Sequence, residues 1–580
     1  MLRKEEDRDD GTRALPPLPG GSSPASPPSA VPAYPVTPRS SPRGSFSVGR
    51  INLGEIEVHE IIEFELVWDS SSSTEREGGV SFYRPVRIPA GFFCLGHCCE
   101  PKGRPPRGSV LVARESTSFE VTSGSYDREC EQKSPALRKP LDFTLVWSSE
   151  VETEGGDEGR GYIWLPEAPD GYTPLGYLVT KTSAKPGLEE VRVARLDLTD
   201  ACEKYRLLFD AESKSHGLAL TVWSSRPLHR GIHGKGVPVG TFLCDHDGKF
   251  REGRCHSCLK NMDVSMHAMP TLDQVHSLIN HYGPTIFFHP DEEFLPSSVP
   301  WFFKAGALLF KQGQHSGEHI DANGSNLPLG GCNDGEYWID LPRYHKTTNI
   351  KRGNLDSAVL YVHVKPALGG TSTDVAMWVF FPFNGPATLK LGIVDIGLGK
   401  IGQHVGDWEH FTLRISNFTG ELQSIYFSQH SGGQWVDTRD LEFVNANKAA
   451  VYSSKGGHAS FPRPGTYLQG SNNLGIGIRN DAAHSDLKLD SSMRYEIVAA
   501  EYLGEEGNAI EPPWLNYMRT WGPAVVYGSR NRLDRIMNAL PRGIGGRARA
   551  VLGKLPAELS GEEGPTGPKE KNNWEGDERG

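Results

Sequence analysis

Apolar and polar residues alternate in short runs along most of this chain, and Gly, Pro, Asn or Asp bound most of the runs. Period-2 alternation is typical of a half-buried β-strand. Because turn residues separate the runs, we expect a mainly-β fold with an antiparallel β-sandwich over residues 263–528. The strands predicted there are Thr285 to His289, Glu336 to Asp340, Ala358 to Val364, Val375 to Phe381, Trp408 to Ile415, Glu421 to Gln429 and Tyr495 to Tyr502.

The first half of the chain contains an internal repeat. Phe-Glu-Leu-Val-Trp, ending at Trp68, returns as Phe-Thr-Leu-Val-Trp, ending at Trp147, and a fainter copy, Leu-Ala-Leu-Thr-Val-Trp, ends at Trp223. A strand, a polar loop and a turn into another strand form one unit that needs neighbours to cover its apolar face. The repeat therefore predicts that residues 48–262 form a three-repeat β-prism-like domain in which the three indoles are buried at equivalent positions.

The pattern predicts few and short helices. Thr271-Leu-Asp-Gln274 has the spacing of a capping box, and the apolar residues after it predict a helix that ends at Tyr282-Gly-Pro. Another short helix is expected after Ser529, so residues 529–580 are predicted to hold a C-terminal helix and a polar tail. Residues 1–47 are rich in Pro, Ser and Gly and predict a disordered tail, because they bury too little apolar area to offset the ordering entropy.

Composition narrows the class of protein. A net charge of -11 argues against a nonspecific nucleic-acid binder. No apolar run approaches the ~18 residues of a membrane-spanning helix, and the charged start does not resemble a secretory signal. Nine unevenly placed cysteines fit a reducing compartment better than a disulfide framework. We therefore expect a cytoplasmic protein with no transmembrane span and no nucleic-acid partner.

Ionisable side chains gather in one otherwise apolar segment, residues 401–411. On a strand, Asp407 and Glu409 share one face, whereas Trp408 lies on the other. Two neighbouring carboxylates are tolerated mainly where a cation, an arginine or a shared proton neutralises them. The segment therefore predicts a metal site with His404, Asp407 and Glu409 as ligands. A solvated strand face with an aromatic residue packed behind it remains an alternative.

The sequence of this segment, His404-Val-Gly-Asp-Trp-Glu-His, resembles the Gly-His-Arg-His-Asp-Trp-Glu heptapeptide of the necrosis- and ethylene-inducing-peptide-like proteins. Those proteins are β-sandwiches with a divalent cation near one end. The resemblance implies that Asp291 completes the metal shell. It also implies a ligand pocket formed by His458, Lys455, Trp408 and Glu292. Carboxylate and imidazole ligands suit Ca²⁺, Mg²⁺ or Mn²⁺.

Four longer sequence motifs resemble those of a second family. They are Tyr282-Gly-Pro-Thr-Ile-Phe-Phe-His-Pro-Asp-Glu292, Gly406-Asp-Trp-Glu-His410, Ser453-Ser-Lys-Gly-Gly-His-Ala-Ser460 and Gly561-Glu-Glu-Gly-Pro-Thr-Gly-Pro-Lys-Glu-Lys571. From about residue 50 onward the chain is similar to the plant family related to vacuolar protein sorting-associated protein 62. The repeat also resembles the adaptor-binding repeats of chorein-type lipid-transfer proteins.

These resemblances imply a non-enzymatic, cytoplasmic protein that is peripheral on endomembranes. Its expected partners are a lipid headgroup or glycan, held with the help of the cation, and trafficking adaptor proteins. The rival interpretation is a metal-dependent hydrolase that uses the same pocket, with His410 or His458 as general base. The chain has no Gly-x-Ser-x-Gly elbow, Walker loop or His-Glu-x-x-His motif.

Overall fold

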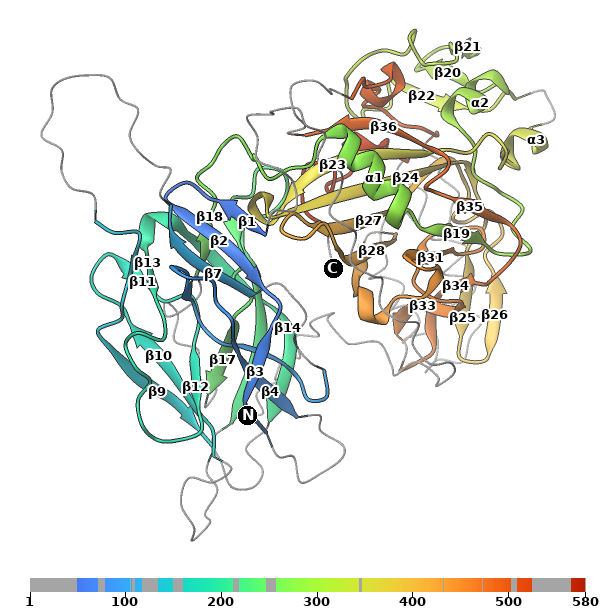
Figure 1. The fold of residues 1–580 in the computed structure, drawn as a ribbon. Helices are drawn as coiled ribbons and strands as arrows, with labels where there is room; N and C mark the ends of the chain where they lie inside the picture. The colour runs from blue at the N-terminus through green and yellow to red at the C-terminus, as the bar shows by residue number, and fades with distance from the viewer. Residues whose placement is uncertain are drawn as a thin grey trace, which may run out of the picture.

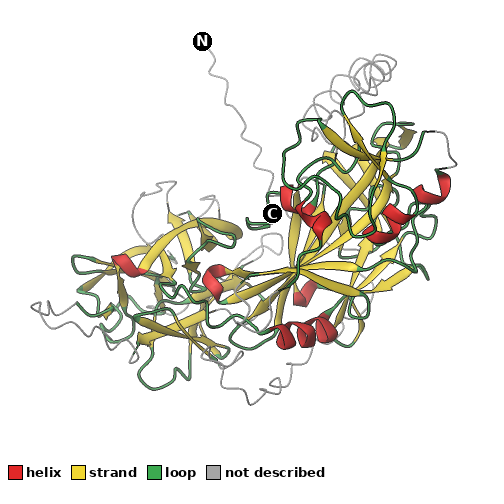
Figure 2. Ribbon diagram, turned by 90° about the horizontal axis from the view of Figure 1, so that it is seen from above, coloured by secondary structure: helices red, strands yellow, loops and turns green. Residues whose placement is uncertain are grey.

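The chain folds into two β-rich lobes, with β1 to β18 in the first lobe and β19 to β36 in the second (Figure 1). The computed structural model describes residues 49–70, 79–104, 106, 110–116, 134–149, 160–211, 219–246, 257–343, 347–430, 432–471, 473–501, 509–523 and 565–578. Strands are the main regular element of both lobes, and the helices are short (Figure 2). The predicted mainly-β fold is confirmed. The tail predicted at 1–47 and the helix predicted after Ser529 lie outside the described residues.

Three antiparallel meanders build the first lobe. They consist of β3 (Phe64–Asp69), β4 (Val80–Pro85) and β6 (Cys98–Pro101); β9 (Asp142–Ser148), β10 (Tyr162–Glu167) and β12 (Leu178–Thr180); and β14 (Thr199–Ala211), β15 (Leu220–Pro227) and β17 (Phe242–His246). The other strands form two separate sheets, one with the order β1 (Arg50–Asn52), β2 (Ile56–Ile61), β7 (Val110–Glu115) and β5 (Phe93–Cys94), and one with the order β11 (Tyr172–Thr173), β13 (Val193–Arg195) and β8 (Leu137–Arg138). The third meander is extended beside β14 by β18 (Ser257–Lys260) and then β16 (Gly236–Val237). The β-prism label itself stays a prediction.

The first strand of each meander bends at the same place. The register shifts between Leu66 and Trp68 on β3, beside Trp147 on β9, and between Leu207 and Phe209 on β14. A bulge of this kind adds one residue, kinks the strand and re-aims the side chains around it. All three meanders then contribute apolar side chains to a single core. A bulged first strand at a comparable position therefore recurs in each of the three meanders.

The third copy of the repeat, however, was assigned to the wrong strand. Trp68 and Trp147 lie on first strands, are each 8% exposed, and have ring centroids 5.7 Å apart. Trp223 lies on the middle strand β15 opposite Leu207, and it is only half-buried. The pairing places Phe209 of β14 where Trp68 and Trp147 stand. Similar apolar motifs on neighbouring strands have the same composition. Only strand pairing shows which motif lies on the first strand of a meander and which on the middle strand.

Close backbone approach explains two glycines at the junction of the repeats. A Cβ on Gly176 would lie 2.5 Å from Cγ2 of Thr241. Gly96 has φ +151°, and its Cβ would lie 2.8 Å from the Cα of Gly176. Here the backbone N–H of His97 donates to the carbonyl oxygen of Tyr177 at 2.8 Å. Only glycine fits turns that meet this closely.

A six-stranded sheet forms the centre of the second lobe. Its order is β29 (Gly432–Asp437), β28 (Leu422–Gln429), β27 (His404–Ser416), β24 (Ser372–Asn384), β23 (Leu360–Ala367) and β36 (Tyr495–Ala500). One face packs against α1 (Leu272–Tyr282) and a sheet of β30 (Phe443–Asn445), β31 (Lys448–Ser453), β19 (Thr285–Phe288) and β35 (Lys488–Asp490), with β32 (Ser460–Phe461) beside β31.

The other face of the central sheet is covered by α2 (Val299–Lys304), α3 (Thr348–Lys351) and a sheet of β21 (Glu318–His319), β20 (Leu308–Lys311) and β22 (Tyr337–Asp340). A further sheet consists of β26 (Val394–Gly397), β25 (Thr388–Leu391), β34 (Ile476–Ala482) and β33 (Gly465–Ser471). No helix in the described part of the chain is both long and apolar enough to cross a bilayer.

Most elements of the second lobe follow the sequence pattern. A strand covers the core of every predicted strand segment, and the capping box forms: Oγ1 of Thr271 accepts from the N–H of Gln274, whose Oε1 accepts from the N–H of Thr271. The expectation of an all-antiparallel arrangement is wrong in two places, because β19 pairs with β31 and β23 pairs with β36 in parallel.

Residues 565–578, near the C-terminus, pack along the second lobe, and residues 575–577 at the end of this stretch also contact the first lobe (Figure 1). The ring of Trp574 stacks on His363 with a centroid distance of 4.0 Å. The carboxylate of Asp577 lies 3.0 Å from Arg414 of the second lobe and 3.0 Å from Arg230 of the first. The segment that composition predicts to be a polar tail thus includes a stretch tied to both lobes.

Candidate functional site

A buried ion pair forms the centre of the candidate site. Asp407 lies on β27 opposite Phe381 and is 8% exposed, whereas His458, in the turn after β31, is 1% exposed. Nδ1 of His458 lies 2.9 Å from Oδ2 of Asp407, and Nε2 lies 3.1 Å from the carbonyl oxygen of Phe294. Both ring nitrogens of His458 therefore have an oxygen partner within hydrogen-bond distance, one on β27 and one in the loop after β19.

The groups around Asp407 oppose the effect of burial on its pKa. Burial alone would raise the pKa of Asp407, but the hydrogen bond from His458 and the nearby His404 together hold the pKa below its ordinary value. The ring of His458 also stacks on Phe381, with centroids 3.8 Å apart and planes 4° from parallel. His458 has a φ of +56°, which is uncommon outside glycine and shows that the surrounding contacts fix its position.

Glu292 joins the loop after β19 to the turn that carries His458. Its side chain is 2% exposed. Oε2 accepts from the N–H of Gly456 at 2.7 Å, and Oε1 accepts from the N–H of Phe294 at 2.9 Å. Oε1 also lies 3.9 Å from Nε2 of His458. Glu292 therefore organises the backbone behind the site rather than facing solvent.

A polar pocket of 450 Å³ opens beside this network, and we call it the Lys455 pocket. Asp291, with its side chain 74% exposed, lies 3.9 Å from Nζ of Lys455 at its rim. The pocket is lined by His289, Asp291, Lys455, Gly465, Thr466, Arg479, Asp481 and Ala482. It presents cationic, anionic and hydroxyl groups at one surface opening.

The remaining predicted site residues separate onto the two faces of β27. Glu409 shares the face of Asp407, as the alternation predicts, and its Oε2 accepts from Oγ of Ser428 at 2.8 Å. His404 donates from Nδ1 to the carbonyl oxygen of Gly406 at 2.7 Å, and burial lowers its pKa although Asp407 opposes that effect. Trp408 lies on the other face, 3% exposed in the aromatic core, so it does not line the Lys455 pocket.

The four predicted metal ligands do not converge on one point. Asp407 is bonded to His458, Glu409 to Ser428, and Asp291 lies at the exposed rim. Among the described residues no group of three or more His, Cys, Asp or Glu side chains is arranged to hold a metal ion. Each of these side chains has its own partner in the structure, and the cation stays a prediction.

Comparison with known proteins identifies the family. The family model described as vacuolar protein sorting-associated protein 62, Vps62, matches residues 23–578. The chain belongs to the Vps62 family. Two proteins of Saccharomyces cerevisiae are similar to it. Vacuolar protein sorting-associated protein 62 is 24% identical over 290 residues, which are 41% of this chain and 58% of that protein. The putative vacuolar protein sorting-associated protein TDA6 is 22% identical over 262 residues, 37% of this chain and 53% of that protein.

The match therefore spans little more than half the length of these two Vps62 relatives. Among solved structures, GNIP1Aa from Chromobacterium piscinae has a TM-score of 0.28 at 12% identity, covering 39% of this chain and 40% of that one. NLPPya in complex with glucosamine has a TM-score of 0.20 at 11% identity, covering 46% and 81%. At these TM-scores the structural likeness supports no conclusion about this Vps62-family chain.

Several pocket residues of this Vps62-family chain had no signal in the sequence. Thr466 lies on β33, and Arg479 and Asp481 lie on the neighbouring strand β34. Nε of Arg479 donates to Oδ1 of Asp481 at 2.9 Å, and two such residues on one strand have the pattern of an ordinary surface ion pair. Their relevance appears only when β33 and β34 fold beside the turn that carries Lys455.

Proposed function

We propose that this Vps62-family protein is a non-enzymatic, cytoplasmic protein that acts peripherally on endomembranes in vacuolar sorting. One observation carries the proposal: the 450 Å³ Lys455 pocket opens beside the rigid network of Asp407, His458 and Glu292. Concave sites with a few convergent polar groups on a fixed scaffold are typical of ligand binding. The names of the two yeast relatives support the sorting process.

The ligand chemistry follows from the groups at the pocket. Lys455 and Arg479 offer cationic donors, Asp291 and Asp481 offer carboxylate acceptors, and Thr466 offers a hydroxyl that does both. A ligand rich in hydroxyl groups, with or without a phosphate, can use all three kinds of partner. A lipid headgroup or a glycan is therefore the ligand class that we propose.

Binding is favoured over hydrolysis by the state of the two candidate bases. His410 lies on the opposite face of β27, where Nε2 is 3.0 Å from Oε2 of Glu578. His458 is buried, both of its ring nitrogens have protein partners, and it does not line the Lys455 pocket. A hydrolase would need a general base within reach of its substrate.

A divalent cation, Ca²⁺, Mg²⁺ or Mn²⁺, remains part of the proposal as a prediction. Its ligands would be Asp291, His404, Asp407 and Glu409. Asp407 would have to exchange His458 for the ion, and Glu409 would have to exchange Ser428. Carboxylates are suitable ligands for these hard cations.

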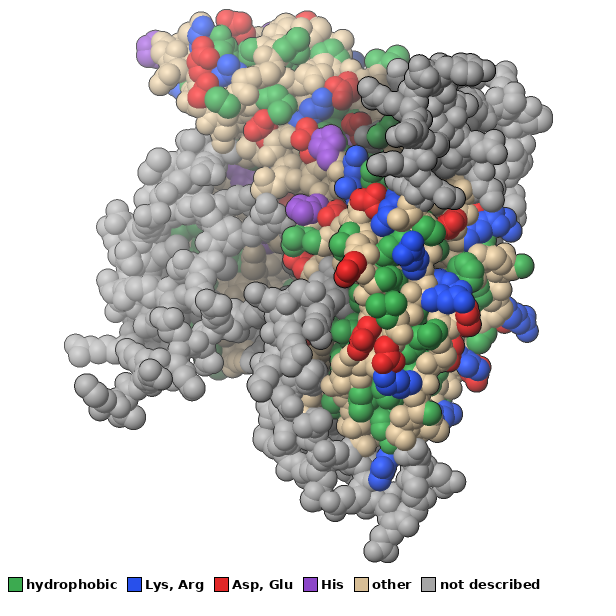
Figure 3. All heavy atoms as spheres, turned by 90° about the vertical axis from the view of Figure 1, so that its left-hand side faces the viewer, with side chains coloured by type: hydrophobic (Ala, Val, Ile, Leu, Met, Phe, Trp, Pro, Cys, Tyr) green, Lys and Arg blue, Asp and Glu red, His purple; other side chains and the backbone are tan. Residues whose placement is uncertain are grey.

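The first lobe supports an adaptor-binding role. The bulge on each first strand leaves the same leucine outside: Leu66 is 45% exposed, Leu145 45% and Leu207 46%. On the face shown in Figure 3, apolar side chains lie among charged groups of both signs. An apolar contact framed by mixed charge suits a protein partner. We propose that trafficking adaptor proteins bind this lobe.

Calorimetry with the full chain tests the pocket. The probes are vesicles containing phosphatidylinositol and, separately, D-mannose. Lys455→Gln should clearly weaken binding, whereas Lys102→Gln should leave it unchanged. Lys102 is a matched control because both lysines are 46% exposed and both lie near an aspartate, Lys102 at 3.3 Å from Asp69. Equal binding by the two variants, or no binding by the wild type, would refute the proposed pocket.

The cation has its own test. Metal analysis and calorimetry with Ca²⁺, Mg²⁺ and Mn²⁺ are carried out on the wild type and on Asp407→Asn. Weaker cation binding in the variant is expected. If the wild type binds none of the three ions at about millimolar concentration, the cation is wrong while the pocket can still stand. Turnover of ester, phosphoester or glycoside substrates would instead establish the hydrolase.

A further inference from the structure

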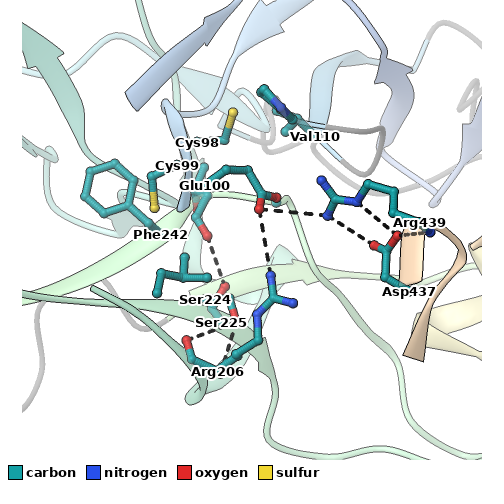
Figure 4. Close-up of a pocket in the computed structure, with 14 residues that line it drawn as sticks. Cys98, Cys99, Glu100, Val110, Arg206, Ser224, Ser225, Phe242, Asp437 and Arg439 are labelled. Carbon is teal, nitrogen blue, oxygen red and sulfur yellow. Dashed lines mark hydrogen bonds and ion pairs between the residues drawn. The ribbon is translucent and has the colours of Figure 1, made fainter. Parts of the chain in front are cut away.

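A second pocket, of 190 Å³, lies between the two lobes (Figure 4), and we call it the Glu100 pocket. Glu100 lies on β6 and Arg206 lies on β14, both in the first lobe. Asp437 and Arg439 belong to the second lobe. Ser224 and Ser225 of β15 also line it. The Glu100 pocket shares no lining residue with the Lys455 pocket.

The carboxylate of Glu100 forms long ion pairs with two guanidinium groups but no hydrogen bond with either. Oε2 is 3.8 Å from Nη2 of Arg206 and 3.9 Å from Nη2 of Arg439, and both distances are too long for a hydrogen bond. The Glu100 side chain is only 18% exposed, and Oε2 has no hydrogen-bond partner among the described residues. A buried carboxylate oxygen with no donor is costly, which favours a site where a ligand supplies the donor.

The two arginines differ in mobility. Arg439 is held by Asp437, whose Oδ1 accepts from Nε at 3.0 Å and whose Oδ2 accepts from Nη2 at 3.2 Å. Arg206 has a side chain that is 50% exposed, while its backbone N–H donates to Oγ of Ser224 at 3.1 Å. One guanidinium is therefore fixed and the other can adjust to a ligand.

The charges of the lining residues balance. Glu100 and Asp437 oppose Arg206 and Arg439, so the described lining carries no formal net charge when all four are ionised. Burial raises the pKa of Glu100, although Arg439 and Arg206 oppose that effect. A second anion would compete with Glu100 for the same guanidinium groups. A neutral ligand that both donates and accepts hydrogen bonds suits this surface better.

We propose that the Glu100 pocket binds two adjacent hydroxyl groups of a neutral ring polyol, such as a sugar or an inositol ring. Each hydroxyl would donate to the Glu100 carboxylate and accept from one guanidinium, Arg206 on one side and Arg439 on the other. Charge-assisted hydrogen bonds of this kind are the stronger ones. The space of 190 Å³ holds about six water molecules at the volume of liquid water, so it admits one ring and not a chain.

The test uses the full chain, with myo-inositol and D-mannose as probes and saturation-transfer NMR as the measurement. Cyclohexanol, which has the ring but a single hydroxyl, is the matched ligand control. Binding of a polyol at about 10 mM, with no binding of cyclohexanol, is expected. Absence of polyol signal, or equal signal from cyclohexanol, would overturn the proposal.

Two variants locate the signal. Measured in the Lys455→Gln background, so that the Lys455 pocket does not contribute, Arg206→Gln should weaken polyol binding at least about tenfold, because it removes one of two charged donors. Arg84→Gln should not change it: Arg84 is 51% exposed, also pairs with a glutamate, and lies outside the pocket. If Lys455→Gln abolishes the signal while Arg206→Gln does not, the polyol occupies the Lys455 pocket and this inference fails without harming the proposed function.

The source of the ring is a further arm of the same experiment. Vesicles containing phosphatidylinositol that bind the wild type and the Lys455→Gln variant, but not Arg206→Gln, would identify a lipid headgroup in the Glu100 pocket. Binding of the free ring without binding of these vesicles would identify a soluble sugar or polyol. Either result supports the proposal, because the hydroxyl chemistry is the same.

Discussion

Replacing Glu578 by glutamine should release the C-terminal segment 565–578 from the lobes. Glu578 is 2% exposed, and its oxygens accept from Thr412 Oγ1 at 2.6 Å, Asn573 Nδ2 at 2.8 Å and His410 Nε2 at 3.0 Å. Burial would raise the pKa of Glu578, but His410, Lys365 and these hydrogen bonds hold it at about 2, compared with 4.5 for a free glutamate. Glutamine keeps the shape and removes the charge.

The pKa difference sets the size of the effect. At ~1.4 kcal/mol per pH unit, the fall from 4.5 to about 2 corresponds to ~3 kcal/mol that favours the docked segment. Because the pKa of Glu578 is lower in the docked state, this stabilisation is fully present above pH 4.5 and is lost as the pH falls towards about 2. The difference between wild type and Glu578→Gln should therefore be large at pH 7 and close to zero near pH 2.

Hydrogen exchange read by mass spectrometry on peptides from residues 565–578 measures the effect locally. At pH 7, ~3 kcal/mol corresponds to opening that is about 100-fold more frequent in Glu578→Gln. Glu575→Gln is the control, because Glu575 belongs to the same segment and its side chain is exposed. Unchanged protection in Glu578→Gln, the same loss in Glu575→Gln, or a loss that does not shrink at low pH would each contradict the reasoning.

Two predictions concern the first lobe. Gly176→Ala would place a Cβ 2.5 Å from Cγ2 of Thr241 and should lower the free energy of unfolding by about 1–3 kcal/mol in urea titrations, whereas Gly397→Ala, which meets nothing within 4 Å, should change it little. Trp68→Ala should destabilise by about 3–5 kcal/mol and Trp223→Ala by clearly less, since Trp68 is 8% exposed in the shared core and Trp223 is half-buried; equal losses on thermal melting would contradict the strand assignment.

The parts of this protein that follow from local sequence are the directions of side chains within an element. Along β27 the period of two places Asp407 and Glu409 on one face and Trp408 and His410 on the other, and the structure has them so. The capping box of α1 is also local, since its partners lie three residues apart. Such features are predictable because neighbouring residues share one backbone geometry.

The tertiary structure decided which faces meet. Alternation predicted that Asp407 needs a counter-charge but not that His458 meets it at 2.9 Å on an aromatic ring. The motif that ends at Trp223 resembles the motifs of the first strands, but strand pairing places it on the middle strand of its meander. Glu578 belongs to a segment without periodicity, and two of its partners, His410 and Thr412, lie more than 150 residues away. Contacts of this kind depend on burial shared between distant segments, which local sequence does not encode.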